Sequence, residues 1–169
     1  MKPRVYVAVL VLIIPFQSSL FDALSFSGIK PDLALAILYI IGLLTSPAEA
    51  ALAGMAIGLV QDIGSAGLIG FTGIIRGLEG LAAGFLGARV LDISSPVMVL
   101  FLTAFSLAQG IFISFFLQIT YGSVPFLAMM GGRVLPQALY TGILGFFLLR
   151  LISRKNVLPA LMRRDFQKE

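Results

Sequence analysis

Apolar stretches long enough to cross a lipid bilayer recur along this chain of 169 residues, and they constrain its fold more than any other feature. A spanning helix needs about 20 mostly apolar residues. Apolar residues make up 59% of the sequence and charged residues only 12%, and the mean hydropathy is +1.03. A soluble domain of this size cannot bury so much apolar surface, because small domains expose a large fraction of their atoms. We therefore predict an all-α integral membrane protein rather than a soluble enzyme.

Six spanning helices are predicted from these stretches and from the residues that separate them. The first runs from Val5 to Phe21. Its basic start and apolar run also fit a cleaved signal peptide, but Ala23-Leu24-Ser25 is a poor cleavage site, so we expect a retained helix. The other five are expected over residues 31–45, 47–62, 72–91, 96–121 and 132–151.

Proline, glycine and capping residues set the expected helix ends. Pro31-Asp32 predicts a helix start, because proline suits the first turn and an acid favours the positive end of the helix dipole. Ser46-Pro47-Ala48-Glu49 has the form of a capping box, which predicts a very short turn and a new helix. Gly122 and Pro125 then break the chain, so we expect the apolar segment 126–130, too short to cross, to be an interfacial or re-entrant piece.

The distribution of basic residues predicts that both ends of the chain lie in the cytoplasm. With this orientation, only Lys30 and Arg133 lie outside, and Arg76 lies within a span. Nine basic residues lie inside: Lys2, Arg4, Arg89, Arg150, Arg154, Lys155, Arg163, Arg164 and Lys168. Such an excess marks the cytoplasmic side of a membrane protein. The net charge of +4 therefore indicates orientation in the bacterial inner membrane rather than nucleic-acid binding.

These features divide the chain into a six-helix transmembrane domain over 1–152 and a basic cytoplasmic tail over 153–169. The tail is expected to anchor on anionic lipid, with contact to a cytoplasmic partner as the alternative.

Two stripes of small residues predict close packing between the third and fourth predicted helices. The first stripe consists of Ala50, Gly54 and Gly58, which are spaced four residues apart, and Asp62 follows at the same spacing. The following helix carries a second stripe on one face: Gly73, Gly77, Gly80, Gly84 and Gly87. Small residues let helix backbones approach closely in lipid, so we predict a tight hairpin. The alternative is that one stripe forms a docking groove for a helix of another protein.

Arg76 and Glu79 are three residues apart, a spacing at which side chains on one helix can pair. Each would cost about 2.5 to 3.5 kcal/mol if it stood alone at the centre of a bilayer. One interpretation is a self-satisfied pair near the outer interface. The other is a polar lining of an internal cavity, or a contact to a polar group of a partner.

Asp62 is expected to cap the glycine-rich turn that follows it, with help from Ser65. The alternative role for Asp62 is to fix this loop for a partner or ligand. Gln109 and Gln118, which do not share a helix face, are expected to form separate interhelical hydrogen bonds.

The composition excludes several kinds of chemistry. The chain has no Cys and no His, so disulfides, thiolate chemistry and a Ser-His-Asp triad are impossible. Asp32, Asp62 and Asp92 are isolated in sequence, unlike the Asp-rich metal motif of phospholipid synthases. We therefore predict no catalytic, cofactor-binding or metal-binding residues.

Two motifs carry a resemblance to a known family. Lys30-Pro31-Asp32-Leu33 heads an apolar helix, and Gly58-Leu59-Val60-Gln61-Asp62-Ile63-Gly64-Ser65 is followed by further glycines and a glycine-rich helix. This pattern resembles the bacterial rod shape-determining protein MreD. Arg76 and Glu79 lie outside the family pattern.

The resemblance implies a non-catalytic scaffold of the cell-elongation machinery, which maintains rod shape and organises peptidoglycan synthesis. Its implied partners are the bitopic membrane protein MreC and, further, MreB and peptidoglycan synthases. The site residues expected for partner binding or structure are Pro31, Asp32, Gly54, Gly58, Asp62, Ser65, Arg76 and Glu79.

The family is also similar in fold to the substrate-binding membrane subunits of energy-coupling-factor transporters, which have six helices around a pocket. A vitamin or micronutrient transporter subunit is therefore the alternative function, with Arg76 and Glu79 as pocket groups.

Overall fold

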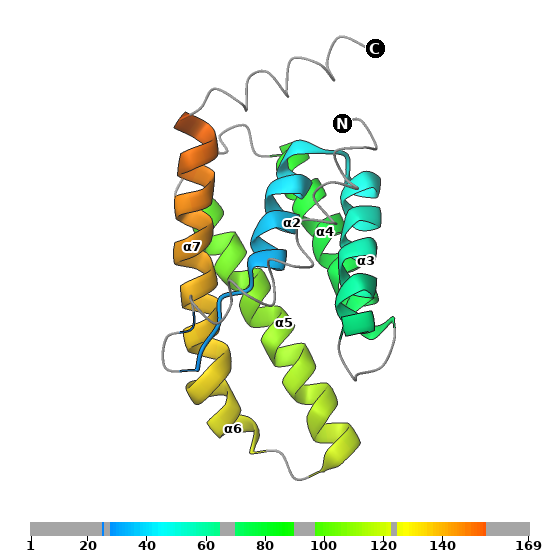
Figure 1. Cartoon of the computed structure of the whole chain (residues 1–169), viewed down its shortest axis with the longest axis vertical. Coiled ribbons are helices and arrows are strands. Elements are labelled where there is room, and N and C mark those ends of the chain that lie inside the picture. Colours follow the sequence, from blue (N-terminus) through cyan, green and yellow to red (C-terminus); the bar gives the residue numbers. More distant parts are fainter. Residues whose placement is uncertain (1–24, 26–27, 65–69, 90–96, 123–124, 155–169) are drawn as a thin grey trace.

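The computed structural model describes residues 25, 28–64, 70–89, 97–122 and 125–154, which form an all-α bundle (Figure 1). The helices are α2 (Leu33–Leu44), α3 (Pro47–Gly64), α4 (Phe71–Arg89), α5 (Val97–Tyr121), α6 (Phe126–Met129), the π-helix η1 (Met130–Val134) and α7 (Leu135–Arg154). From α2 to α5 each helix runs opposite to the one before it, and the continuous stretch from α6 through η1 to α7 runs opposite to α5. The predicted helices between residues 31 and 121 are confirmed to within about three residues at each end.

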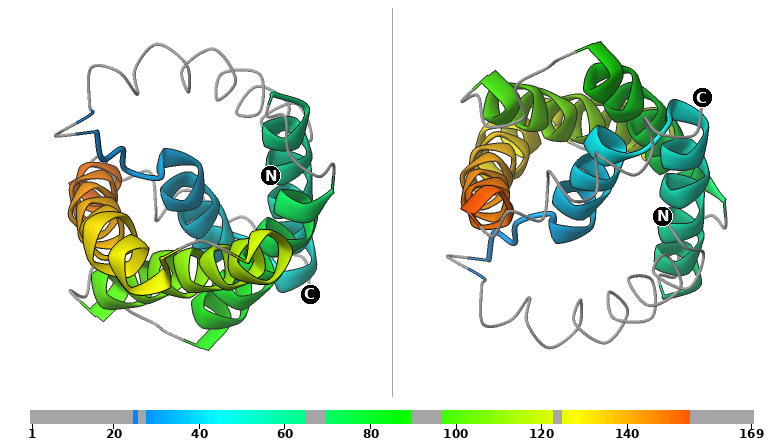
Figure 2. Two further views of the ribbon diagram at one scale, coloured as in Figure 1. Left: turned by 90° about the horizontal axis from the view of Figure 1, so that it is seen from below. Right: turned by 90° about the horizontal axis from the view of Figure 1, so that it is seen from above.

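Helix α2 forms the centre of the bundle. Figure 2 shows it between α3 on one side and α7 on the other, with α4 and α5 along a third side. Its side chains Leu35, Tyr39 and Leu43 pack with Ala83 of α4, Leu102 of α5 and Leu149 of α7 in one buried cluster. The high apolar content of α2 is therefore used inside the protein.

Capping residues set the ends of the helices around the first turn. Asp32 is the N-cap of α2, because its Oδ1 accepts a hydrogen bond of 2.8 Å from the Leu35 backbone N–H. Pro31 therefore precedes the cap and does not lie in the first turn, which corrects the prediction. At the other end of α2, Ser46 Oγ accepts from the Glu49 N–H at 3.4 Å, and α3 begins at Pro47 as expected.

The segment 126–130 is helical and continues into the last helix, so its interpretation as a separate interfacial or re-entrant piece is wrong. Pro125 precedes the first turn of α6, and the chain passes through η1 into α7. The wider π-helical turn contains Gly131 and Gly132 and keeps the helix continuous from α6 into α7.

Two described helical stretches, rather than six, are long and apolar enough to cross a membrane by themselves. They are Val99–Thr120 and the continuous stretch Phe126–Arg150. Helix α2 has only 12 residues, and glycines and charged residues lower the hydropathy of α3 and α4. The predicted first span, residues 5–21, and all but the first two residues of the tail, 153–169, lie outside the described residues.

Helices α3 and α4 form the tight hairpin that their glycine stripes predict. Gly58 lies against Gly73, and a Cβ added at Gly58 would lie only 2.5 Å from the Gly73 Cα atom. A Cβ at Gly54 would overlap the backbone carbonyl of Arg76. Gly54 and Gly58 therefore face α4, and the alternative of a docking groove for another protein does not fit these two residues.

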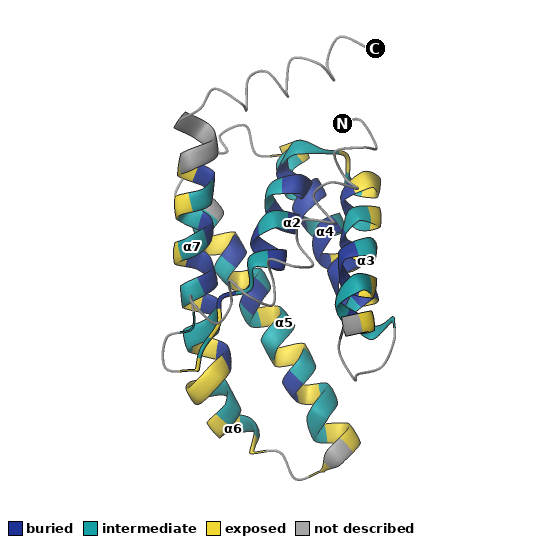
Figure 3. Cartoon of the chain, in the orientation of Figure 1, coloured by how far each residue is buried: buried dark blue, intermediate teal, exposed yellow. Residues whose placement is uncertain are grey.

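Large apolar side chains cover much of the outer surface of the bundle. Figure 3 shows exposed positions along α3, α5, α6 and α7. The exposed fractions reach 79% at Ile63 and 84% at Leu127. Exposed apolar surface on this scale is unusual for a soluble monomer and marks a membrane or protein contact.

We expect Gly54→Ala to destabilise the protein by about 1–3 kcal/mol, because the added methyl group must displace the α4 backbone. The matched control is Gly131→Ala, since a Cβ there meets nothing within 4 Å. Thermal unfolding of both purified variants measures the difference. Equal unfolding temperatures would show that the two helices do not pack through Gly54.

Candidate functional site

A buried arginine on α4 forms the centre of the polar site. Arg76 is only 2% exposed and forms ion pairs with two carboxylates. Its Nη2 atom contacts Asp32 Oδ2, and its Nη1 atom lies 3.1 Å from Glu79 Oε2. The predicted pairing of Arg76 with Glu79 is confirmed, and Arg76 lies inside the bundle rather than on its surface. The expected position of the pair near the outer interface stays a prediction.

Two glutamines complete the hydrogen bonding of the guanidinium group. Arg76 Nε donates to Gln61 Oε1 at 3.2 Å, and Nη1 donates to Gln109 Oε1 at 3.1 Å. All three guanidinium nitrogens therefore have an acceptor, and the acceptors come from α3, α4, α5 and the N-cap of α2. We call Asp32, Gln61, Arg76, Glu79 and Gln109 the Arg76 network.

Asp32 connects the Arg76 network to three helices. Its Oδ1 caps α2, while its Oδ2 accepts from Arg76 and from Gln109 Nε2 at 3.5 Å. Its backbone N–H donates to Thr141 Oγ1 at 2.9 Å, and that hydroxyl donates in turn to the Gln137 carbonyl. One residue thus fixes the start of α2 relative to α4, α5 and α7.

The charges of the Arg76 network do not balance within it. Two carboxylates face one guanidinium group, and Glu79 Oε1 has no hydrogen-bond partner among the described residues. Removing Arg76, the only cation that pairs with these acids in the described part of the chain, would leave both without a counter-charge. Breaking a buried pair in this way destabilises proteins by about 3–5 kcal/mol.

Asp62 is the cap of α4, as one of the two interpretations predicts. Its Oδ2 accepts from the backbone N–H groups of Gly70 at 2.8 Å and Gly73 at 3.3 Å, and Asp62 is only 2% exposed. Gly70 has φ of +94°, a conformation that favours glycine. Ser65 lies outside the described residues, so its expected contribution to the cap is not tested.

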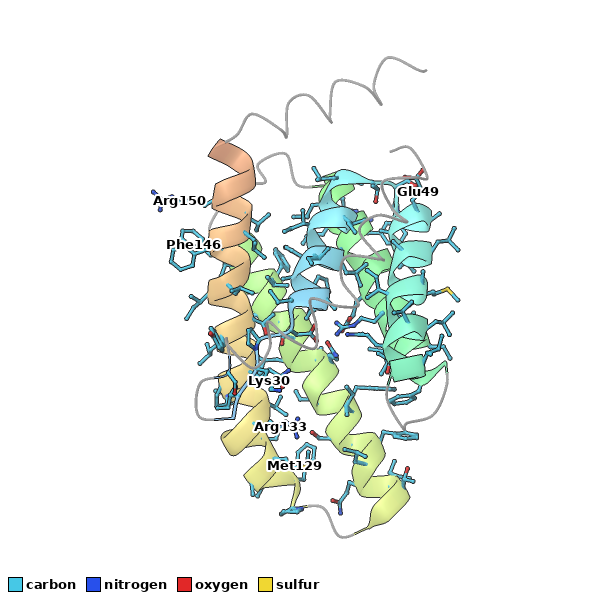
Figure 4. The ribbon with its side chains drawn as sticks, in the orientation of Figure 1. Lys30, Glu49, Met129, Arg133, Phe146 and Arg150 are labelled. Carbon is cyan, nitrogen blue, oxygen red and sulfur yellow. The ribbon has the colours of Figure 1, made fainter. Side chains whose placement is uncertain are left out.

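A cavity of about 350 Å³ lies between α5 and the α6–η1–α7 helix, and it shares Asp32 and Gln109 with the Arg76 network. Met129 and Arg133 line this cavity, and Figure 4 shows them in the lower half of the molecule, away from Glu49 and Arg150 near the other end. The polar lining residues are Asp32, Ser106, Gln109, Ser114, Arg133 and Gln137. Neither Arg76 nor Glu79 lines this cavity, although the transporter alternative placed them in a pocket.

The structure brings together Asp32, Arg76 and Glu79, whereas Asp62, Gly54 and Gly58 serve the α3–α4 hairpin. Gln109 forms the expected interhelical hydrogen bonds. The expectation for Gln118 is wrong, because its Nε2 atom donates to Gly122 at the end of its own helix, at 3.4 Å.

Several polar residues of the site were not predicted from the sequence. Gln61 lies directly before Asp62 in the second motif, and Thr141 lies in an apolar stretch. A signal for the cavity was present in α5, where Ser106 and Gln109 are three residues apart and therefore share a helix face.

The described residues include no group of three or more acidic side chains that could hold a metal ion. No family model, curated protein or solved structure matches this chain. The resemblance to the MreD family stays a prediction from the two sequence motifs.

We expect Arg76→Met to lower the stability by about 3–5 kcal/mol, because Asp32 and Glu79 would lose their shared counter-charge. Adding Glu79→Leu should restore part of the loss by removing one of the two stranded acids. The control is Arg89→Met, at an exposed position of the same helix. Thermal unfolding measures all three, and equal effects of Arg76→Met and Arg89→Met would contradict a structural role of the Arg76 network.

Proposed function

We propose that this protein is a membrane-embedded, non-catalytic scaffold of the MreD type, which binds MreC in the bacterial cell-elongation machinery. The observation that carries the proposal is the structural role of Asp32 and Asp62, the two acidic residues of the sequence motifs. Asp32 pairs with Arg76 across the bundle, and Asp62 caps α4. Motif residues that hold the fold together suit a protein whose activity is to present a surface to a partner.

The exposed apolar side chains support placement in a bilayer. They cover α3, α5 and α7, and the polar side chains of the Arg76 network face inward. We infer six crossings in the bacterial inner membrane, with residues 5–21 as the first and a bundle similar to the transporter subunits named above. MreB and peptidoglycan synthases are the further partners of this proposal.

The positions of the charged residues support the proposed orientation. The C-terminal ends of α4 and α7 lie at one end of the bundle and carry Arg89 and Arg150 (Figure 1). Lys30 and Arg133 lie away from that end (Figure 4). This separation fits the rule that basic residues concentrate on the cytoplasmic side.

Co-purification with MreC tests the proposed function. We expect MreC, produced in the same cells, to co-purify with the tagged wild-type protein in detergent, because helices associate through closely packed surfaces. The control is a bitopic membrane protein of unrelated function that is produced at the same level. If MreC is recovered no better than this control, the scaffold proposal is wrong.

Substitution of exposed faces then locates the contact. One variant replaces Leu52, Met55 and Leu59 of α3 by Ala, and the other replaces Leu139, Ile143 and Phe147 of α7 by Ala. We expect one variant to lose MreC and the other to keep it, since a single partner helix covers one face. Gly54 and Gly58 are unsuitable for this test because they pack inside the hairpin.

Single cysteines test the orientation, because the natural chain has none. We expect Pro125→Cys, at the start of α6, to react with a membrane-impermeant maleimide in intact spheroplasts, and Ala48→Cys, in the first turn of α3, to be protected. Both positions are exposed, so both should react after the membrane is permeabilised. Reaction of Ala48→Cys in intact spheroplasts would reverse the proposed orientation.

A further inference from the structure

The cavity beside Asp32 is lined by two buried serines whose hydroxyl groups have no hydrogen-bond partner among the described residues. Ser106 is 7% exposed and Ser114 only 1% exposed, yet neither hydroxyl forms a hydrogen bond within the described part of the chain. The threonines of α5 and α7 behave differently. Thr103, Thr120 and Thr141 each donate to the carbonyl four residues earlier, at 2.8–2.9 Å. The two serine hydroxyls are therefore available to form hydrogen bonds with a molecule inside the cavity.

The opposite wall adds two further polar groups without partners. The Gln137 side chain and the Arg133 guanidinium group line the cavity from α7 and η1, and neither has a hydrogen bond or ion pair among the described residues. Buried polar groups in native proteins almost always have a partner. Gln137 is half-buried and Arg133 is exposed, so only Ser106 and Ser114 are buried residues. An unsatisfied buried group costs about 1–3 kcal/mol, so two unpartnered serine hydroxyls that open into one cavity favour a bound polar molecule.

The charges of the lining select an anionic ligand. The Asp32 carboxylate already accepts from Arg76 and Gln109, so it does not require a cation in the cavity. Arg133 is the one lining residue with an unpaired charge in the described part of the chain. Guanidinium groups bind phosphate and carboxylate groups through paired hydrogen bonds.

The shape and surroundings of the cavity point to an amphiphile. A volume of about 350 Å³ lies at the small end of the range for ligand pockets and suits a headgroup without its acyl chains. Ile113, Leu117, Met129 and Val134 form the apolar part of the lining. On the same stretch of helix, Leu127 and Leu135 expose 84% and 51% of their surface, where acyl chains can lie.

We propose that this cavity binds an anionic, hydroxyl-bearing headgroup, with its acidic group on Arg133 and its hydroxyls on Ser106, Ser114 and Gln137. This inference rests on the bilayer placement proposed above but not on binding to MreC. The same chemistry is offered by an acidic glycerophospholipid within the bilayer and by a free glycerol phosphate in water.

Native mass spectrometry of the full chain tests the site with three probes: phosphatidylglycerol, phosphatidylcholine with the same acyl chains, and glycerol 3-phosphate. We expect one phosphatidylglycerol to be retained, at least tenfold more strongly than phosphatidylcholine. Arg133→Gln should weaken this retention about tenfold, the factor that corresponds to one charge-assisted hydrogen bond. Ser114→Ala should weaken it several-fold without changing the fold, because it removes only the hydroxyl.

Arg150→Gln is the matched control, since Arg150 is an exposed arginine of the same helix that lies outside the cavity. It should retain phosphatidylglycerol as the wild type does. Arg133-dependent binding of glycerol 3-phosphate without phosphatidylglycerol would support the site and assign the ligand to the aqueous phase. Equal retention of both lipids, or equal effects of Arg133→Gln and Arg150→Gln, would overturn the inference. These results would leave the co-purification with MreC unaffected, so the two proposals fail separately.

Discussion

Burial of the Arg76 guanidinium group is the constraint on which the rest of the structure depends. A buried cation is stable only if its charge and its hydrogen-bonding protons are matched, and Arg76 obtains this match from the ends or faces of four helices. The short α2 begins where Asp32 can reach Arg76. This contact fixes where α2 begins in the bundle, and its N-cap Asp32 also lines the cavity.

The glycine stripes provide the second condition for that arrangement. Close approach of α3 and α4 brings Gln61 to the side of Arg76, because Gly54 and Gly58 leave no side chains between the two backbones. Asp62 then fixes the start of α4 through backbone hydrogen bonds. Packing by small residues and pairing of buried polar groups thus support each other, as expected where the hydrophobic effect does not drive helices together.

Much of this fold follows from the sequence because its signals are local. Residues close together in the chain determine three of these features: the boundary between α2 and α3 at Ser46 and Pro47, the α3–α4 hairpin, and the Arg76–Glu79 pair. The link between Asp32 and Arg76 spans 44 residues, and no periodicity or motif predicts it. The same holds for the cavity, whose walls come from helices that pack only in the folded state. The segment 126–130 looks too short to cross by itself, but a π-helical turn joins it to α7, and no local sequence signal indicates that turn.

The order of the Arg76 network along the chain has a consequence for biosynthesis. Asp32 and Gln61 leave the ribosome before Arg76, and Glu79 follows it by three residues, so most acceptors for the guanidinium protons are synthesised before or directly after the cation. Only Gln109 arrives with a later helix. A nascent chain that ends after α4 therefore already contains three of the four acceptors of Arg76. In the proposed bilayer placement, the insertion machinery would then not have to release that charge alone into lipid.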